Sequence, residues 1–422
     1  MLVSFVAAAD ASGQQLKVTG AGHSFSPITL TDPEWDGKAL MVNLDKLNAV
    51  LQLPTPSDKT VLVEAGIRVH ELNAALLATA PAPGYALINT GAIAMQSVAG
   101  ATQTGTHGTG RNLGSMASQL VGLTILLANG TMLNCSATQN VDLFDAGRVG
   151  LGALGIVVHA RLAVVPAFKM KRVAMPYNLD ALLADLPALY QRYDRLQWYW
   201  TPYTTDATLL LRIPVPLDTP VTGCWPGDVQ RSQKTGGNVT CIDWSFKTLC
   251  HEADDATLYT EMEYFVPQDN ATAFVQDFRA YQASVSSQSE CRQQGQQPAR
   301  GGSATSPQCA LFAGVRYGKA DNMWMSQMYQ RDIAVLSMIV LGNATTAGPV
   351  DEFALFGHGV EQLAAKYNGR PHWGKMNWAS ASDLKPQYPR FDDFVALRAA
   401  VDPKGMFLNN YLRRVLGIQQ AA

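Results

Sequence analysis

Apolar and polar residues in the first third of the chain recur with the periods of strands and helices. The run TVLVEA at residues 60–65 has a strand-like composition and ends at a glycine, whereas the apolar residues of 69–77 have helical spacing. Two more strands flank the Asn129-Gly130 pair, a sequence that favours a type I′ hairpin, and another is expected over 156–165. The opening run MLVSFVAAAD predicts a helix.

The pattern changes after Pro166, where the helices become longer. We therefore expect one α/β domain over residues 1–167 and a second domain over 168–380. The second domain is predicted to contain helices over 179–193, 271–285 and 350–367, strands over 258–266 and 311–317, and a polar surface loop over 286–306. The tail from Arg390 predicts one more helix, which the sequence DPKG at 402–405 stops.

Composition and charge exclude two classes of function. The chain has 422 residues, 47% hydrophobic and 16% charged, with a net charge of −2. It has no run rich in Lys and Arg, so we expect no nucleic-acid partner. No window offers about 18 consecutive uncharged apolar residues, so no transmembrane segment is expected.

Cysteines and glycosylation sequons bear on the compartment. Cys135 lies in an apolar strand and is predicted to be a buried thiol, and the other five cysteines fall in the polar middle of the chain, enough for two disulfides and one leftover thiol. No spacing suggests zinc. Sequons begin at Asn129, Asn134, Asn238, Asn270 and Asn343. They favour a secreted or lumenal protein, and a cytoplasmic one remains the alternative. The N-terminus lacks the basic segment of a signal peptide.

The sequence GAGHSF at residues 20–25 follows a predicted strand. A dinucleotide fingerprint would place Gly or Ala where this chain has Phe25, and no helical pattern follows, so a Rossmann motif is excluded. A structural turn and an anion cradle, in which bare backbone N–H groups point at a phosphate, both fit the glycines. The candidate residues are Gly20, Ala21, Gly22, His23, Ser24 and Phe25.

A second glycine-rich stretch covers residues 96–110 (QSVAGATQTGTHGTG). Its small and hydroxylated residues suit a backbone that lies against a flat ligand and offers hydrogen-bond donors to it. A flexible linker is the alternative, but the interleaved Val98, Ala99 and His107 argue against one. The candidate ligand-binding residues here are Ser97, Gly100, Ala101, Thr104, Gly105, Thr106, His107 and Gly108.

Four motifs in the same order resemble one family. They are GAGHSF, SVAGATQTGTHGTG, GLGALGIV with Gly155 and Ile156, and GRPHWGK at 369–375. The chain resembles the aldonolactone oxidases of the vanillyl-alcohol-oxidase flavoprotein group, which also contains the alditol oxidases. The resemblance implies an α+β fold, with an FAD-binding PCMH-type domain and an α+β cap domain for the substrate. It also implies that residues 381–422 return to the FAD domain.

The resemblance implies how FAD is held. His23 occupies the position that the family joins covalently to the flavin, where the related galactonolactone dehydrogenases have leucine. Gly91, beside Ala92, occupies the position where those dehydrogenases carry an alanine that shields the flavin from oxygen. Both positions favour an oxidase. Family members also have a further strand and helix before the region that matches Met1, so we expect an N-terminal element of the FAD domain to be missing here.

The resemblance also implies catalytic residues. Hydride transfer from a carbinol needs positive charge beside the reduced ring, and Lys375 and Arg316 match the family positions for it, with His372 and Trp373 nearby. The family's usual Glu-x-Arg pair is broken here, because position 314 is Gly314. Glu261 and Glu263 are candidate replacements. Ser337 and Ile339 stand where alditol oxidases have histidine and threonine, which disfavours an alditol substrate.

The expected function is therefore FAD-dependent oxidation of a sugar 1,4-lactone, of the L-gulono-1,4-lactone type. Oxygen is the expected acceptor, and a 2-keto lactone and hydrogen peroxide are the expected products. Two alternatives remain open at this point: an oxidase of alditols or other carbohydrates, and a flavin-binding homologue without turnover.

Overall fold

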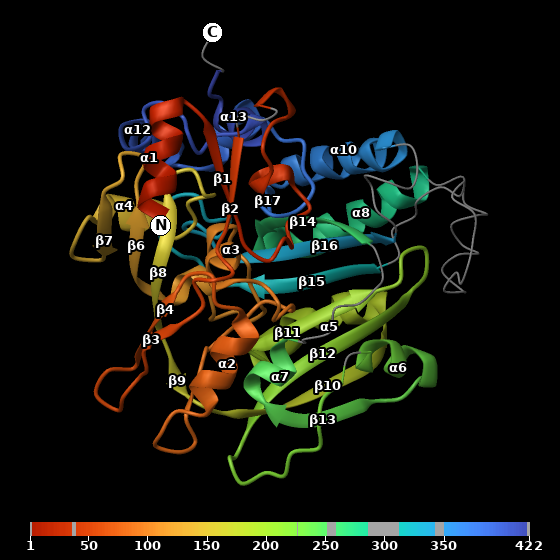
Figure 1. The fold of residues 1–422 in the computed structure, drawn as a ribbon. Coiled ribbons are helices and arrows are strands. Elements are labelled where there is room, and N and C mark those ends of the chain that lie inside the picture. Colours follow the sequence, from red (N-terminus) through yellow and green to blue (C-terminus); the bar gives the residue numbers. More distant parts are fainter. Residues whose placement is uncertain are drawn as a thin grey trace.

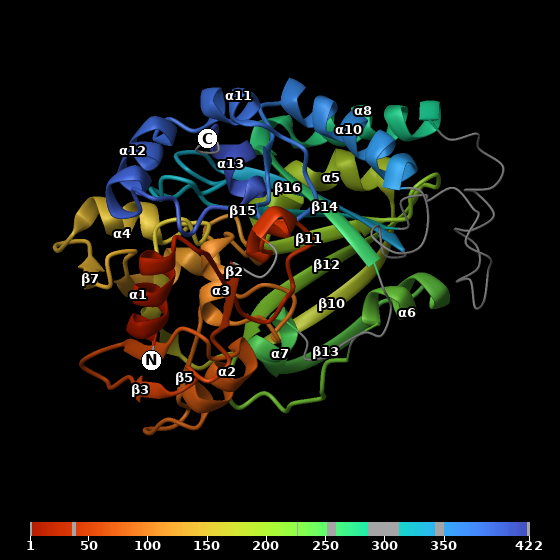
Figure 2. The same cartoon turned by 45° about the horizontal axis from the view of Figure 1, so that its top comes forward.

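The computed structural model describes residues 2–35, 39–225, 227–250, 259–285, 312–341 and 350–419. These residues form an α+β fold with two large hydrophobic cores (Figures 1 and 2). The first core is built mainly from the N-terminal third of the chain and the C-terminal helices. The second core lies between a large sheet and the helices that cover one of its faces.

The N-terminal third contains a five-stranded antiparallel sheet in the order β3-β4-β8-β6-β7, the parallel pair β1-β2 and the short pair β5-β9. Its strands are β1 (Gln15–Thr19), β2 (Ala39–Asn43), β3 (Val50–Gln52), β4 (Thr60–Glu64), β5 (Tyr85–Ala86), β6 (Leu120–Leu126), β7 (Met132–Ser136), β8 (Ile156–Ala163) and β9 (Val165–Pro166). Its helices are α1 (Leu2–Ser12), α2 (Val69–Leu77), α3 (Val98–Gln103) and α4 (Val141–Gly147).

The C-terminal helices pack onto this region, as Figure 1 shows for the blue α12 and α13 beside the red α1 and β1. They are α11 (Ala381–Leu384), α12 (Phe391–Val401) and α13 (Asn410–Leu416). Phe394 and Leu412 are fully buried in the first core, and the Leu16 N–H donates to the Met406 carbonyl at 2.9 Å. The end of the described chain is therefore part of the same core as its beginning.

An eight-stranded antiparallel sheet forms the rest of the molecule, in the order β13-β10-β12-β11-β15-β16-β14-β17. Its strands are β10 (Lys169–Asn178), β11 (Arg195–Trp200), β12 (Asp206–Val215), β13 (Val239–Trp244), β14 (Tyr259–Pro267), β15 (Phe312–Gly318), β16 (Ile333–Leu341) and β17 (Arg370–Pro371). The helices of this region are α5 (Leu179–Arg192), α6 (Asp228–Thr235), α7 (Ser245–Leu249), α8 (Ala271–Val285) and α10 (Val350–Lys366). Short 3-10 turns occur at Pro27–Thr29, Pro33–Trp35, Met116–Gln119, Gln268–Asn270 and Lys385–Gln387.

The two faces of this sheet differ in polarity because side chains alternate along each strand. One face carries apolar residues such as Trp198, Val315 and Leu336, which pack with residues of α5, α8 and α10 in the second core. The opposite face carries charged and polar side chains, which are mostly buried against the N-terminal region. We call it the polar face. Its members include Gln197, Tyr199, Arg212, Glu261, Glu263, Gly314, Arg316 and Ser337.

Most predicted elements are confirmed. The 69–77 helix is α2 without change, and α1, β4, β8, α5, α8, α10 and α12 agree with prediction within about two residues. The strands predicted over 258–266 and 311–317 are β14 and β15, each displaced by one residue. Strands β10 to β13 were not predicted. The loop predicted over 286–306 lies outside the described residues.

The predicted type I′ turn is wrong, although the hairpin between β6 and β7 is present. A type I′ turn centred on Asn129-Gly130 would need a positive φ at both residues, and only Gly130 has one, at +81°. The Gly130 N–H instead donates to the Leu127 carbonyl at 3.0 Å. Gly130 is thus the last residue of the turn.

The cysteines agree with the prediction as far as they are described. Cys224 and Cys241 form a disulfide, and Cys135 is buried, which raises the pKa of its thiol to about 11. Cys250 is also buried, and Cys291 and Cys309 lie outside the described residues. Asn129, Asn134 and Asn238 are exposed, as glycan acceptors must be.

Candidate active site

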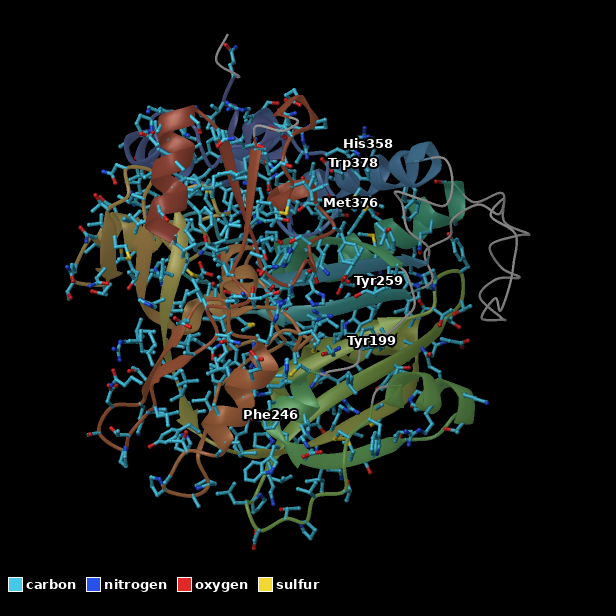
Figure 3. The ribbon with its side chains drawn as sticks, viewed as in Figure 1. Tyr199, Phe246, Tyr259, His358, Met376 and Trp378 are labelled. Atoms are coloured by element: carbon cyan, nitrogen blue, oxygen red, sulfur yellow. A yellow bond between two sulfur atoms is a disulfide. The ribbon has the colours of Figure 1, made fainter. Side chains whose placement is uncertain are left out.

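Four residues form a row across the polar face. Tyr199 on β11 faces Gly314 on β15, Gly314 faces Ser337 on β16, and Ser337 faces Glu263 on β14. Figure 3 labels Tyr199 among the strands of the eight-stranded sheet. Because side chains alternate along a strand, Arg316, two residues after Gly314, lies on the same face. The sheet register therefore brings together side chains from four strands.

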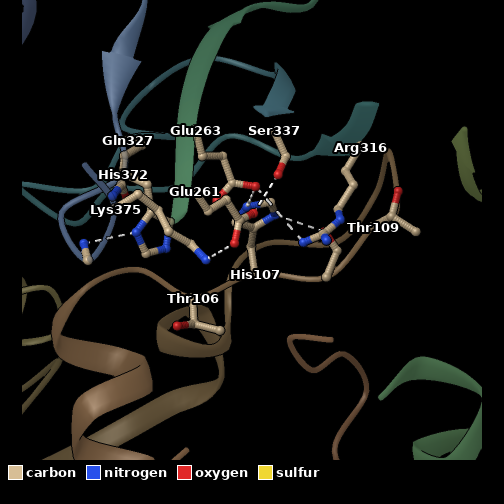
Figure 4. A network of polar contacts seen from close by, with 12 residues as sticks. Thr106, His107, Thr109, Glu261, Glu263, Arg316, Gln327, Ser337, His372 and Lys375 are labelled. Atoms are coloured by element: carbon tan, nitrogen blue, oxygen red, sulfur yellow. Dashed lines mark hydrogen bonds and ion pairs between the residues drawn. The ribbon is translucent and has the colours of Figure 1, made fainter. Parts of the chain in front are cut away.

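An ion pair between Lys375 and Glu261 lies beside this row (Figure 4). The Lys375 ammonium contacts Glu261 Oε2, while the Ser337 hydroxyl donates to Glu261 Oε1. Burial by itself lowers the pKa of Lys375, but the carboxylates of Glu261 and Glu263 outweigh that effect and raise it above its ordinary value. Lys375 is therefore positively charged at neutral pH, and its Nζ lies 4.8 Å from the ring centroid of Phe25.

A second cluster of polar and charged side chains surrounds Glu263, which is 2% exposed. Its Oε1 lies 3.3 Å from His107 Nε2 and 3.9 Å from Arg316 Nη1. Burial favours the neutral acid, but His107, His372 and Arg316 outweigh burial and hold the pKa of Glu263 below its usual range. Burial also lowers the pKa of Arg316, yet Tyr199 and the two glutamates raise it overall. Both groups are thus charged.

His372 is a neutral histidine in this cluster. Burial is the largest cause that lowers its pKa, to about 3, and the opposing effect of Glu263 is too small to restore it. The Gly374 N–H donates to His372 Nδ1 at 2.9 Å, so the ring proton resides on Nε2. The His372 ring centroid lies 6.2 Å from that of His107.

The Tyr199 ring explains why residue 314 is a glycine. A Cβ atom at residue 314 would lie 2.9 Å from Cδ1 and Cε1 of the Tyr199 ring, so the ring occupies the space that a side chain there would need. The Tyr199 hydroxyl accepts a hydrogen bond from Gln197 Nε2 and is hydrogen-bonded to Arg316. Arg316 is therefore contacted both by the Tyr199 phenol and, at 3.9 Å, by the Glu263 carboxylate.

The GAGHSF and GRPHWGK motifs are in direct contact. The Phe25 N–H donates to the Gly374 carbonyl at 2.8 Å, and the Ser26 hydroxyl donates to the Trp373 carbonyl at 2.6 Å. Trp373 is fully buried in the first core. His23 is half-buried and lies two residues before Phe25, whose ring contacts Lys375.

The GAGHSF motif also touches the second glycine-rich stretch. Ser97 caps α3 by accepting a hydrogen bond from the Gly100 N–H at 3.2 Å. A Cβ atom at residue 20 would lie 2.1 Å from Ser97 Oγ, so only glycine allows this approach. Ala21, Gly22 and Ser24 follow it on the surface of the loop, each at least partly exposed.

The remainder of the second stretch lies against the polar face (Figure 4). Gln327 donates to the Thr104 carbonyl at 3.1 Å, and Gln96 donates to the Thr106 hydroxyl at 3.3 Å. The predicted Ala101, Gly105 and His107 are buried in the same segment. These contacts place residues 104–107 beside Glu263.

Two predicted glycines, Gly91 and Gly108, lie beside a small pocket between the N-terminal region and the polar face. A Cβ atom at residue 91 would lie 2.5 Å from Thr106 Cγ2. The pocket is lined by Thr90, Ala92, Gly108, Thr109, Gln197, Arg212, Leu249 and Arg316. By contrast, Gly155 directly precedes β8, which begins at Ile156, and the Ile156 side chain is buried in the first core rather than at the pocket.

The sequence motifs did not point to five residues of this site: Thr90, Thr109, Gln197, Tyr199 and Arg212. A signal existed for Arg212, since it is the one charged residue in the apolar run ATLLLRIPV, but strand β12 was not predicted. The polar residues of β11 alternate with tryptophan and leucine, which is the period of a strand with one polar face.

The glycine-rich segments fit FAD. Residues 20–25, 89–92 and 96–108 carry mostly small side chains, which suits a flat ring, and a Cβ atom at residue 20 would lie 2.1 Å from Ser97 Oγ, so the backbone there is bare. We infer that FAD would be held by these three segments, with Lys375 and His372 at the ring.

Family models match both regions. The model described as FAD binding domain matches residues 1–136, and the model described as D-arabinono-1,4-lactone oxidase matches residues 229–415. Together the two models match most of the chain, which is therefore similar to the aldonolactone oxidases in both of its regions. It is an FAD-dependent oxidoreductase that acts on CH–OH groups of a small molecule.

The chain is similar both to proteins named as lactone oxidases and to one named as a lactone dehydrogenase. The chain is 29% identical over 423 residues to an L-gulonolactone oxidase of Bos taurus, with 97% of this chain and 91% of the relative covered. It is 28% identical over 450 residues to an L-gulono-1,4-lactone dehydrogenase of Mycobacterium tuberculosis, covering 99% and 94%. A D-arabinono-1,4-lactone oxidase of Yarrowia lipolytica is 38% identical over 200 residues, covering 47% of this chain and 36% of the relative.

The fold agrees with solved structures of another oxidase. Cholesterol oxidase from Brevibacterium sterolicum superposes with a TM-score of 0.76 at 16% identity, covering 98% of this chain and 92% of that one. The α+β, PCMH-type fold class is thereby confirmed. Within the described part of the chain, no helix has the length and apolar composition to cross a bilayer, and no group of three or more potential ligands could hold a metal ion.

The neutral state of His372 yields a pH prediction. Its pKa is about 3 in the folded protein against 6.5 as the ordinary value, so unfolding takes up a proton between these pH values. Its contribution to stability is therefore full above pH 6.5 and falls as the pH drops toward 3. We expect 15N NMR of labelled histidine to show an Nε2–H tautomer that does not titrate between pH 5 and 8. A titration of His372 near pH 6.5 would contradict the burial argument.

Proposed function

We propose that this enzyme oxidises a carbinol carbon of a sugar 1,4-lactone of the L-gulono-1,4-lactone type, with O2 as acceptor. The carbinol loses two electrons and two protons to become a 2-keto lactone, and O2 gains them to become hydrogen peroxide. FAD, when bound, supplies the acceptor for the hydride. The named activities of the relatives support a lactone, and the polar face supports a polyhydroxylated substrate.

The observation that carries this proposal is the charged Lys375 held by Glu261 beside Arg316. A hydroxyl group bound between these two cations loses its proton more easily, because both charges favour the alkoxide. The same cations stabilise negative charge that accumulates in the site. The Ser337 hydroxyl and the Tyr199 phenol supply polar atoms that can orient the remaining hydroxyl groups.

The proposal also includes the residue that replaces the glutamate of the Glu-x-Arg pair, which is absent at Gly314. Glu263 is separated from Gly314 by Ser337 alone in the row of the polar face, and it lies 3.9 Å from Arg316. We infer that Glu263 supplies the negative charge next to Arg316, and that Tyr199 fills the space left at Gly314. Glu261 is less suited to this role, because Lys375 and Ser337 already occupy its oxygens.

Turnover on a substrate panel tests the function. Purified holoenzyme is offered 1,4-lactones, free sugars and alditols, with peroxide release and reduction of an artificial dye followed in parallel. We expect 1,4-lactones to be the best class and peroxide to account for their oxidation. Preference for alditols would support the carbohydrate-oxidase alternative. No reduction of either acceptor by any compound would indicate a flavin-binding homologue without turnover.

A covalent bond between His23 and the flavin is the second part of the proposal. Its support is the partly exposed imidazole in the loop that contacts the Lys375 segment. We expect yellow flavin to remain in the acid-precipitated protein and to be released from His23→Ala. His358→Ala, at an exposed histidine of α10, serves as the control and should retain the flavin. Full release from the unmodified protein would overturn the covalent bond.

The use of O2 rests on the absent side chain at Gly91. A methyl group there meets Thr106 Cγ2 at 2.5 Å, so Gly91→Ala alone would disturb the loop. Thr106→Ser removes that carbon and keeps the hydroxyl that accepts from Gln96. We expect the double variant G91A/T106S to react with O2 at least 10-fold more slowly than T106S, with dye reduction within threefold. Equal O2 rates in the two variants would show that Gly91 only serves the turn.

A further inference from the structure

Two arginines line the small pocket above the polar face without any carboxylate in its lining. Arg212 and Arg316 contribute from β12 and β15, and the other lining residues are neutral. Arg212 is 8% exposed. Its Nε donates to the Thr248 carbonyl at 2.7 Å and its Nη1 donates to Gln197 Oε1 at 2.6 Å, which are uncharged acceptors. Among the described residues, no carboxylate lies within ion-pair distance of Arg212.

The strand register increases the positive charge at this place. Arg212 faces Arg195 on β11 and Arg172 on β10, so three guanidinium groups stand in one row across neighbouring strands. Like charges directly opposite one another are destabilising in a sheet. Burial is the largest cause that lowers the pKa of Arg212, and the nearby Arg172, Arg316 and Arg195 lower it further. Tyr199 opposes them, and the resulting pKa is about 9. Arg212 is still charged at neutral pH.

A buried hydroxyl in the opposite wall is unused. Thr90, which is 1% exposed, lines the pocket, and its Oγ1 has no hydrogen-bond partner among the described residues. Buried hydroxyls in folded proteins are nearly always hydrogen-bonded. The pocket therefore offers a hydrogen-bonding group on one wall and two guanidinium groups on the other, and what would satisfy both is an anionic ligand with oxygen atoms.

The charge balance indicates a single negative charge. Of the two guanidinium groups that line the pocket, Arg316 has Glu263 at 3.9 Å, which leaves the charge of Arg212 uncompensated there. A carboxylate carries one charge and matches the planar fork of a guanidinium group. A phosphate dianion would exceed this balance.

We propose that the pocket binds a carboxylate of the substrate, so that the preferred substrate is an acidic carbohydrate lactone rather than a neutral one. This proposal rests on the proposed function. Arg316 then lies between the reacting carbinol near Lys375 and the carboxylate, and Arg212 is a specificity-determining residue at the far end. The neutral polyol end of a simple lactone would leave Arg212 without a counter-charge.

The test compares two lactones that differ at one carbon. D-Glucaro-6,3-lactone has the ring of L-gulono-1,4-lactone with a carboxylate in place of the terminal CH2OH group. We expect the wild-type holoenzyme to oxidise the acidic lactone with at least 10-fold higher kcat/KM. In Arg212→Gln, kcat/KM for the acidic lactone should fall about 10- to 100-fold, mainly through KM, the size expected for one charged hydrogen bond. The neutral lactone should change less than threefold.

Arg172→Gln is the matched control, because Arg172 stands in the same row but does not line the pocket. It should alter neither substrate by more than threefold. Preference of the wild type for the neutral lactone, or an equal loss on both lactones in Arg212→Gln, would overturn the proposal.

A measurement of lactone binding distinguishes a failure of this proposal from a failure of the proposed function. If no lactone is turned over, the proposed function is wrong, and thermal stabilisation of the wild-type holoenzyme by the acidic lactone still measures the pocket. We expect Tm to rise with the acidic lactone and not with the neutral one. Equal shifts with both lactones, or no shift with either, would overturn the carboxylate site. If Arg212→Gln does not fold, the wild-type Tm comparison decides.

Discussion

The central physical constraint in this structure is the burial of charge on one face of the eight-stranded sheet. Glu261, Glu263, Arg212, Arg316 and Lys375 are all largely withdrawn from water. A buried charge costs several kcal/mol unless a partner compensates it. Glu261 is compensated by Lys375 and Glu263 by Arg316 and His107. The register of β14, β15 and β16 must therefore be maintained, because a slip by one residue would exchange these charges with the apolar face.

This constraint links the two regions of the molecule. The apolar face is buried by α5, α8 and α10, and the polar face is buried by loops of the N-terminal region. The hydrogen bonds from Phe25 and Ser26 to the 373–374 backbone hold the GAGHSF loop against the loop that carries Lys375. A site that needs a flat ring on one side and fixed charges on the other is thereby formed between two separate cores.

Gly314 shows how such a site can change its chemistry without changing its fold. The Tyr199 ring fills the space beside this glycine, and its hydroxyl remains hydrogen-bonded to Arg316. Glu263 supplies the carboxylate next to Arg316, but no carboxylate among the described residues lies within ion-pair distance of Arg212. This explains why the pocket bordered by Arg212 and Arg316 is positive, and why the substrate of this chain need not be that of its relatives.

Local patterns in the sequence predicted much of the fold. The spacing of 69–77 and 60–65 gave α2 and β4, since short-range periodicity decides a helix or strand with one apolar side. Strands β10 and β13 were missed because their pairing is long-range, whereas β11 and β12 form a local hairpin whose alternating polar and apolar residues were a signal that the prediction did not use. The glycine-rich motifs identified the cofactor side, whereas Tyr199 and Arg212 join the site only through the sheet register. The turn at Asn129-Gly130 differs because the Leu127 carbonyl accepts from the Gly130 N–H, whereas a turn centred on this pair would be closed between Ala128 and Thr131.

The most direct test of the account is the rate at which substrate bleaches the bound flavin without oxygen, in wild type and in Lys375→Met/Glu261→Gln. The double variant removes both partners and leaves no uncompensated buried charge. We expect the double variant to contain as much flavin as the wild type and its flavin to bleach at least about 100-fold more slowly, the effect expected for loss of a charge-stabilising group. Lys366→Met, which removes a surface ion pair with Asp277, should bleach at the wild-type rate. Bleaching of the double variant at the wild-type rate would contradict the role of Lys375.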